Sequence, residues 1–237
     1  MCNHERLFKK MNAVIFYSNT GQSKKVAEYF SMKLGYPLVS IENNDVYDFE
    51  NVILVFPIIC QNLPDVIKIF LNKISVKYLT VIATYGKMCC GNVLYEIQDK
   101  YKQNIIAAAY VPTKHSYIDN DEIFCDYDKL IPILEKVNKP ASIKLPKLYK
   151  NPLANLFPKQ RSRLGIKIIK NKNCNECGIC NKHCLFNAIE LGIPNNRCIR
   201  CLKCVYICPN KALDIKVRLP LKLYLRKKKV NKTIIYI

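Results

Sequence analysis

The sequence predicts a doubly wound α/β domain with a five-stranded parallel sheet, followed by a small α+β domain at the C-terminal end. Three observations lead to this prediction. Short apolar runs alternate with helical stretches over residues 11–138, which is typical of a parallel sheet covered on both faces. Eight of the 13 cysteines fall between Cys174 and Cys208. Residues 141–237 hold 22 Lys or Arg against three acidic residues, a formal charge of +19, whereas residues 1–140 carry only +1.

The first strand is expected at residues 12–17, and the turn after it leads into a helix at residues 24–34. That turn reads Ser18-Asn19-Thr20-Gly21-Gln22-Ser23. A strand, a turn rich in hydroxyl groups and a helix predict a phosphate site, because backbone N–H groups at the helix N-terminus face an anion. The simpler alternative is helix capping, in which Thr20 or Ser23 bonds the first free N–H groups.

The alternation continues to the end of the first half. Further strands are expected at residues 38–41, 52–56, 79–84 and 105–111, and further helices at residues 64–73, 92–101 and 127–138. Such a sheet binds its ligands at the carboxyl ends of the strands.

The clustered cysteines form two copies of one motif. Cys174, Cys177, Cys180 and Cys184 have the spacing C-x2-C-x2-C-x3-C, and Cys198, Cys201, Cys204 and Cys208 repeat it before Pro209. Three thiolates two residues apart can bind three corners of a 4Fe-4S cluster, and the cysteine after the x3 gap serves the other cluster. We therefore expect one cluster on Cys174, Cys177, Cys180 and Cys208, and a second on Cys198, Cys201, Cys204 and Cys184. Structural zinc is the weaker alternative, since it usually takes two C-x2-C pairs separated by a longer loop.

Both halves resemble known families. Residues 167–216 closely resemble the bacterial two-cluster ferredoxins, with Leu185 where that family usually has proline. Residues 11–138 resemble the flavodoxins, whose FMN phosphate loop S/T-x-T-G-x-S/T is matched by Ser18, Thr20, Gly21 and Ser23. This resemblance implies a flavodoxin-like sheet that binds FMN.

The flavodoxin resemblance also implies which residues contact the flavin. Asn19 and Gln22 complete the phosphate loop, and two later loops would hold the ring through Pro57, Tyr85, Gly86, Gly91 and Asn92. Flavodoxins commonly stack tryptophan and tyrosine on the ring, and this chain has no tryptophan. Tyr85 is therefore the expected stacking residue, and Tyr95 is the alternative.

Four further side chains fall near the expected flavin loops. They are Cys60, Cys89, Cys90 and His115. The three cysteines could have a redox role, although a single thiol is more often a small apolar filler. His115 could contact the flavin or a substrate, and the alternative is a histidine of a surface loop. Residues 139–164 contain four prolines and many basic residues, which predicts a semi-rigid linker. The expected organisation is thus a flavin domain (11–138), a linker (139–164), a cluster domain (165–216) and a basic tail (217–237).

Together the halves resemble a flavodoxin–ferredoxin fusion of anaerobic microorganisms. The resemblance implies an electron-transfer protein that relays electrons between FMN and two 4Fe-4S clusters within one chain. Two alternatives stay open: a flavin-dependent reductase of a small substrate, and a flavin-free ferredoxin whose first domain serves for docking. No residue is assigned a catalytic role.

The charge of +19 in residues 141–237, against +1 in the rest of the chain, predicts an acidic redox partner protein or peripheral contact with an anionic membrane. Nucleic acid is not expected, because no aromatic stacking platform accompanies the basic residues. Neither a signal peptide nor a membrane-spanning apolar run is recognised, so a cytoplasmic location is expected.

Overall fold

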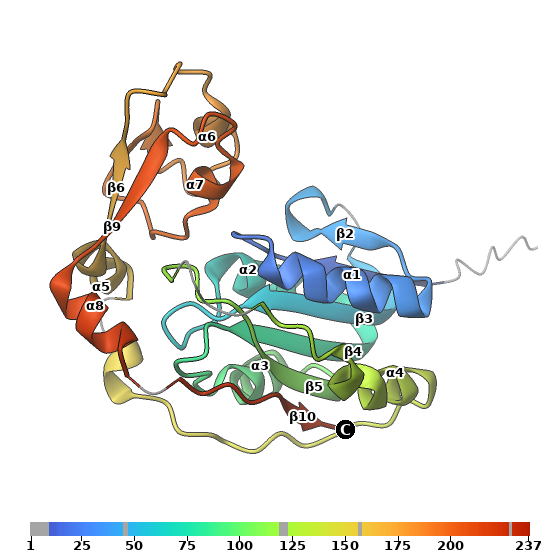
Figure 1. Ribbon diagram of the computed structural model, residues 1–237. Coiled ribbons are helices and arrows are strands. Elements are labelled where there is room, and N and C mark those ends of the chain that lie inside the picture. Colours follow the sequence, from blue (N-terminus) through green and yellow to red (C-terminus); the bar gives the residue numbers. More distant parts are fainter. Residues whose placement is uncertain (1–9, 45–46, 119–122, 156–157, 228) are drawn as a thin grey trace, which may run out of the picture.

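The computed structural model describes residues 10–44, 47–118, 123–155, 158–227 and 229–237. Figure 1 shows a sheet domain, formed by strands β1–β5 and β10 with helices α1–α4, and a smaller cysteine-rich unit, residues 166–217. The mixed α/β architecture expected from the sequence is confirmed for the sheet domain.

The sheet has six strands in the order β10-β5-β4-β3-β1-β2. Five of them are parallel: β1 (Met11–Phe16), β2 (Leu38–Ser40), β3 (Asp48–Pro57), β4 (Ser75–Tyr85) and β5 (Ile105–Pro112). The order of these five is 2-1-3-4-5, which is that of flavodoxin-like doubly wound sheets. The order reverses between β1 and β3, and this is where such folds bind their ligands.

The expected number of five strands is wrong, because the C-terminal tail adds a sixth. β10 (Ile234–Tyr236) pairs antiparallel with β5, with Ile235 opposite Ala109. It covers the backbone groups that β5 would otherwise expose as an edge strand. The segment before β10 is anchored as well, since the Tyr85 hydroxyl donates to the Lys232 carbonyl at 2.6 Å.

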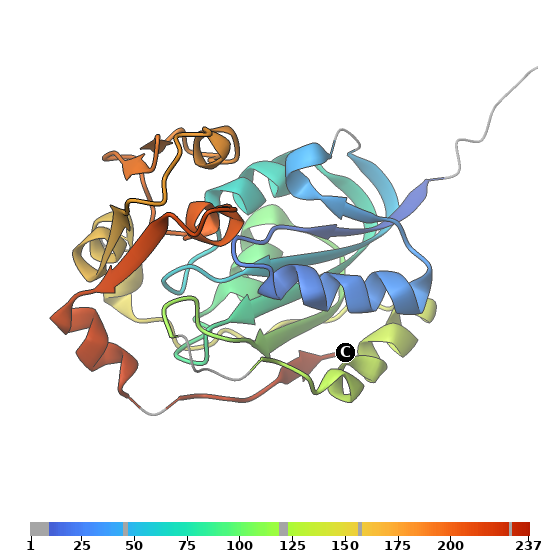
Figure 2. The same ribbon diagram turned by 45° about the horizontal axis from the view of Figure 1, so that its top comes forward.

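Helices cover both faces of the sheet (Figure 2). α1 (Gln22–Leu34) and α4 (Ile131–Asn138) lie on one face, and α2 (Asp65–Lys73) and α3 (Val93–Tyr101) lie on the other. Ile53 of β3 belongs to the same core as Phe30 of α1, whereas the next residue, Leu54, belongs to the core that contains Ile67 of α2. Successive strand residues face opposite sides, so a strand that is apolar throughout requires helices on both.

Short 3-10 helices connect several elements. They are Ile41–Asn43 after β2, Tyr127–Leu130 before α4 and Pro152–Asn155 before α5 (Pro158–Gly165).

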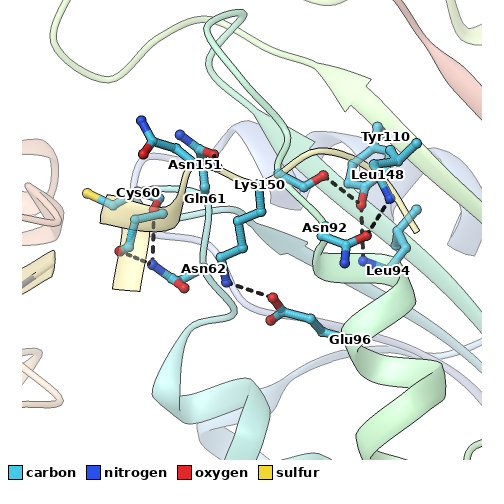
Figure 3. Close-up of polar contacts among 12 residues, drawn as sticks. Cys60, Gln61, Asn62, Asn92, Leu94, Glu96, Tyr110, Leu148, Lys150 and Asn151 are labelled. Atoms are coloured by element: carbon cyan, nitrogen blue, oxygen red, sulfur yellow. Dashed lines mark hydrogen bonds and ion pairs between the residues drawn. The ribbon is translucent and has the colours of Figure 1, made fainter. Parts of the chain in front are cut away.

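Residues 139–151, the first part of the expected linker, form an extended strap held against the sheet domain. Ile143 N donates to the Ile105 carbonyl at 2.9 Å, and the Gln98 side chain bonds both Ile143 O and Leu145 N. Leu145 is buried in the core beside α3. Further along, Asn92 Oδ1 accepts from Leu148 N at 2.7 Å, and Lys150 pairs with Glu96 at 2.6 Å (Figure 3).

The cysteine-rich unit contains two antiparallel strand pairs and two short helices. β6 (Ile166–Lys170) pairs with β9 (Leu213–Val217), and β7 (Ile189–Glu190) pairs with β8 (Ile193–Pro194). The helices are α6 (Ile179–Lys182) and α7 (Lys203–Ile207). α8 (Leu219–Leu225) follows the unit and leads to β10.

The sequence repeat within the unit is also a structural repeat. Glu176 and Arg200, at equivalent positions, have φ angles of 58° and 59°. Equivalent backbone N–H groups bond equivalent sulfur atoms: Ala188 N donates to Cys184 Sγ and Ala212 N donates to Cys208 Sγ, each at 3.3 Å.

Candidate functional site

A cleft of about 510 Å³ lies between the carboxyl edge of the sheet and the cysteine-rich unit. Its volume is within the range of roughly 300–1,000 Å³ typical of small-molecule sites. The loops after β1, β3, β4 and β5 line it from the sheet domain, and residues 199–201, the end of α5 and one side of α8 line it from the other side.

The predicted phosphate loop forms one wall of this cleft. Ser18, Asn19, Thr20, Gln22 and Ser23 all line it. Gly21 is the N-cap residue of α1 and has φ of +83°, a left-handed conformation that glycine adopts without strain. α1 has no side-chain cap hydrogen bond among the described residues. The hydroxyl groups of this loop therefore do not cap the helix, and the capping alternative is not supported.

The loop fits a phosphate group. Ser18 Oγ is buried and has no hydrogen-bond partner among the described residues. A buried polar group without a partner costs about 1–3 kcal/mol, and a phosphate oxygen could accept its hydrogen bond. Ser23 Oγ and Thr84 Oγ1 form a hydrogen bond of 2.8 Å with one another. Because a hydroxyl can both donate and accept, this pair can still form a further hydrogen bond to a ligand.

The two expected ring loops are only partly in the cleft. Pro57, Tyr85 and Gly86 line it. A Cβ atom at Gly86 would lie 2.5 Å from His115 Cδ2, so the absence of a side chain there lets His115 reach the cleft. Cys60 and Cys89 line it as well.

The other expected ring contacts lie elsewhere. Gly91 has φ of +65° and packs against Gln61, where a Cβ would lie 2.9 Å from the Gln61 carbonyl oxygen. Asn92 faces the strap instead (Figure 3), and Tyr95 lies on α3 outside the lining residues. Cys90 packs against the core, and burial raises the pKa of its thiol to about 11.

The expected stacking residue is held by its hydroxyl. Tyr85 lines the cleft but is only 2% exposed. Burial raises its pKa to about 12, and its hydroxyl bonds the Lys232 carbonyl. The tail thus fixes the orientation of this ring.

Several lining residues were not recognised in the sequence, among them Tyr117, Arg200 and Tyr224. The Tyr117 hydroxyl donates to the Arg200 carbonyl at 2.9 Å, and its ring packs edge-on against His115. Burial raises the pKa of Tyr117. Tyr117 therefore connects the loop after β5 with the cysteine-rich unit, a contact between distant segments that has no local sequence signal.

The cysteines separate into two cavities. Cys174, Cys177, Cys180 and Cys208 line one, and Cys184, Cys198, Cys201 and Cys204 line the other. This grouping is the one expected from the spacing. We refer to them as the first and second cysteine sets.

The two sets differ in exposure. Cys177 of the first set is exposed, whereas Cys198 of the second is 9% exposed. Burial raises the pKa of Cys201 to about 11 and that of Cys204 to about 12. Both are therefore neutral thiols at pH 7 unless a bound cation favours the thiolates.

No group of three or more His, Cys, Asp or Glu side chains in the described part of the chain is arranged to hold a single metal ion. Four thiolates bound to the corners of a 4Fe-4S cluster ligate four different iron atoms, so they need not converge as the ligands of one ion do. The residues present fit such a cluster in number and type.

The second cysteine set adjoins the cleft. Asn19, Ile199 and Cys201 line both the cleft and the cavity of this set. An ion pair holds the two parts together nearby, with Lys203 Nζ 2.6 Å from Glu42 Oε1. The cavity of the first set is lined by residues of the cysteine-rich unit.

No helix within the described ranges is long and apolar enough to cross a membrane.

No family model matches the chain, and no curated protein matches it. One solved structure, a "putative flavoprotein" from Bacteroides uniformis, is similar to 45% of this chain and 93% of its own chain, at 14% identity and a TM-score of 0.40. A similarity at that score carries no argument, and the assignment of a flavodoxin-like sheet therefore depends on the strand order described above.

Proposed function

We propose that this chain is an electron-transfer protein that binds FMN in the cleft and one 4Fe-4S cluster on each cysteine set. One observation carries the proposal: the phosphate loop and the second cysteine set meet, since Asn19 and Cys201 line both the cleft and the cavity. When bound, FMN exchanges one or two electrons and each cluster exchanges one.

The residues of the chain supply binding and orientation. The hydroxyl groups of Ser18, Thr20 and Ser23 and the N–H groups at the start of α1 offer donors to the phosphate. Tyr117 and the Lys203–Glu42 ion pair hold the second cysteine set beside the cleft. Because both binding sites belong to one chain, transfer between them requires no bimolecular encounter.

Anaerobic reconstitution tests the proposal directly. We expect eight iron atoms, eight acid-labile sulfides and one FMN per chain, since eight cysteines form two four-thiolate sets. Cys125→Ser is the matched control, because Cys125 is exposed and belongs to neither set. Stoichiometric zinc, or an iron content near four in the unmutated protein, would contradict the cluster assignment. Absence of bound FMN would favour the flavin-free alternative with a docking domain.

A second candidate is a flavin-dependent reductase of a small substrate. Cys89 and His115 line the cleft, and both could contact a substrate beside the flavin. In that case Cys89→Ala and His115→Ala should slow the reduction of a small acceptor while leaving electron transfer to a protein acceptor unchanged. Equal effects on both acceptors, or none, would favour the carrier.

We further propose that the basic half recruits an acidic redox protein. Exposed Lys172, Lys182 and Lys211 belong to the unit that also carries the exposed Cys177. A positive surface attracts acidic partners and raises their association rate at low salt. An anionic membrane is the alternative partner, and binding to vesicles with and without anionic lipid separates the two.

A further inference from the structure

Arg200 is a half-buried cation at the wall of the cleft. Its Nε donates to the Ile166 carbonyl at 3.2 Å, and its own carbonyl accepts from the Tyr117 hydroxyl. Nη1 of the same guanidinium is buried and finds no hydrogen-bond partner among the described residues. A buried donor atom of a charged group is costly without a partner, which suggests that the partner of Nη1 is a ligand.

The position of Arg200 indicates where that ligand would lie. Arg200 lines the cleft, whereas the residues around the second cysteine cavity include its neighbours Ile199 and Cys201 but not Arg200 itself. Arg200 therefore faces the cleft, where we propose that FMN binds, and not the second cysteine cavity.

The internal repeat shows that a cation at this position is not needed for the local fold. The equivalent residue, Glu176, has the same left-handed backbone, with φ of 58° against 59°. Its side chain is exposed and pairs with Lys170 at 2.7 Å. The same position therefore holds a negative residue in the first repeat and a positive residue in the repeat that lines the cleft.

The phosphate loop supplies no cation of its own, since residues 18–23 contain no Lys or Arg. A guanidinium is the side chain best suited to bind phosphate or another delocalised anion, because its N–H groups are fixed in one plane. A flavin nucleotide offers two such anions, its phosphate and its reduced ring.

We propose that Arg200 binds an anionic group of the flavin nucleotide in the cleft, either the phosphate or the reduced ring. This inference rests on the proposed function, because it requires that the cleft binds FMN.

Binding of four ligands to Arg200→Gln tests it: FMN and riboflavin, each oxidised and reduced, measured anaerobically by titration. Arg197→Gln is the matched control, because Arg197 is an exposed cation in the same cysteine repeat. Hydrogen bonds to charged groups contribute more to binding than hydrogen bonds between neutral groups. We therefore expect binding of the recognised anion to weaken about 10- to 100-fold in Arg200→Gln. Arg200→Lys should recover part of this loss, since it keeps the charge but not the planar geometry.

The pattern of losses identifies the anion. If the phosphate is bound, FMN binding weakens in both redox states and riboflavin binding does not change. If the reduced ring is bound, both reduced ligands lose affinity and the oxidised ones do not. The two-electron potential of the bound flavin then falls by about 30–60 mV, the same 10- to 100-fold change expressed as a potential.

Two results would overturn the inference while leaving the proposed function intact. One is unchanged binding of all four ligands in Arg200→Gln. The other is an equal loss for all four, which would indicate a structural role for Arg200. If the unmutated protein binds no flavin, the proposed function itself fails and this inference fails with it.

Discussion

The equivalent cysteines Cys177 and Cys201 offer a matched test of how the proposed clusters relate to the cleft. They occupy the same position in the two motifs, but Cys177 is exposed and Cys201 forms part of the wall between the second cavity and the cleft. Replacing either by serine should remove one cluster and reduce the iron content from about eight to about four. Only Cys201→Ser should also change the properties of bound FMN.

The magnitude follows from the charge that is lost. An oxidised 4Fe-4S cluster with four thiolates carries a charge of about −2, so loss of the proposed second cluster would remove negative charge beside the proposed flavin site. Across a single layer of side chains, taken as ~8 Å with an effective dielectric of ~20, each unit of charge changes the energy of an added electron by roughly 2 kcal/mol, or roughly 90 mV. We therefore expect the flavin potential to rise by tens to more than a hundred millivolts in Cys201→Ser.

Iron analysis and anaerobic redox titration of the flavin absorbance measure both effects. Cys177→Ser controls for general damage to the unit, because it removes the same number of ligands from the repeat that is farther from the cleft. Equal shifts of the flavin potential in the two variants would refute the asymmetry that we infer from the shared wall. A loss of all iron in both variants would instead mean that the two cysteine sets do not fold independently.

Four further predictions test other parts of the structure. Thr20→Asp should abolish FMN binding by placing a like charge against the phosphate, whereas Thr20→Val should only weaken it; retention of full affinity by Thr20→Asp would place the phosphate elsewhere. A double-mutant cycle of Glu42→Gln and Lys203→Gln should give a coupling of about 1–2 kcal/mol in chemical denaturation, because both side chains are largely buried, at 19% and 15% exposure; a coupling near zero would remove this ion pair as a link between the two parts. Asn92→Ala should destabilise the protein by about 1–3 kcal/mol, since it leaves Leu148 N without its acceptor, yet FMN affinity should not change, and a parallel loss of FMN would contradict the position of Asn92 outside the cleft. Replacement of residues 226–229 by glutamine, of which Lys228 lies outside the described residues, should slow reduction of an acidic acceptor severalfold at low salt and little at high salt; identical rates across the salt range would leave this part of the tail without a steering role.

Much of the sheet domain was predictable because its signals are local. The apolar runs that form β1, β3, β4 and β5 are buried on both faces, and the turn from Ser18 to Ser23 occurs at the strand-to-helix junction where it was expected. The grouping of cysteines into two sets was predictable for the same reason, since it follows from spacing within one segment. Each of these features is decided by residues close together in the chain.

The remaining features depend on distant segments meeting. β10 has only three residues in a basic tail, and it becomes a strand because β5 offers an unpaired edge. Asn92 follows β4 as a flavin loop residue would, yet the strap occupies its side chain. Arg200 lies between Cys198 and Cys201, and the spacing of the motif predicts a role only for the cysteines. No periodicity or propensity could have placed Arg200 and Tyr117 at one wall.

The path of the chain gives the cysteine-rich unit two attachments to the sheet domain. On one side the chain reaches the unit after the strap, which is hydrogen-bonded to Gln98 and Asn92. On the other side it leaves the unit as the tail, which is hydrogen-bonded to Tyr85 and pairs with β5. A single flexible linker would keep two sites close without fixing their orientation. Two attached ends restrict the unit far more, because it cannot rotate about one connection. The tail also bonds the hydroxyl of a tyrosine that lines the cleft, so the segment that restrains the unit also orients a wall of the proposed flavin site. A carrier that exchanges electrons between neighbouring centres benefits from this arrangement, since a fixed separation keeps the exchange within the chain independent of slow domain motion.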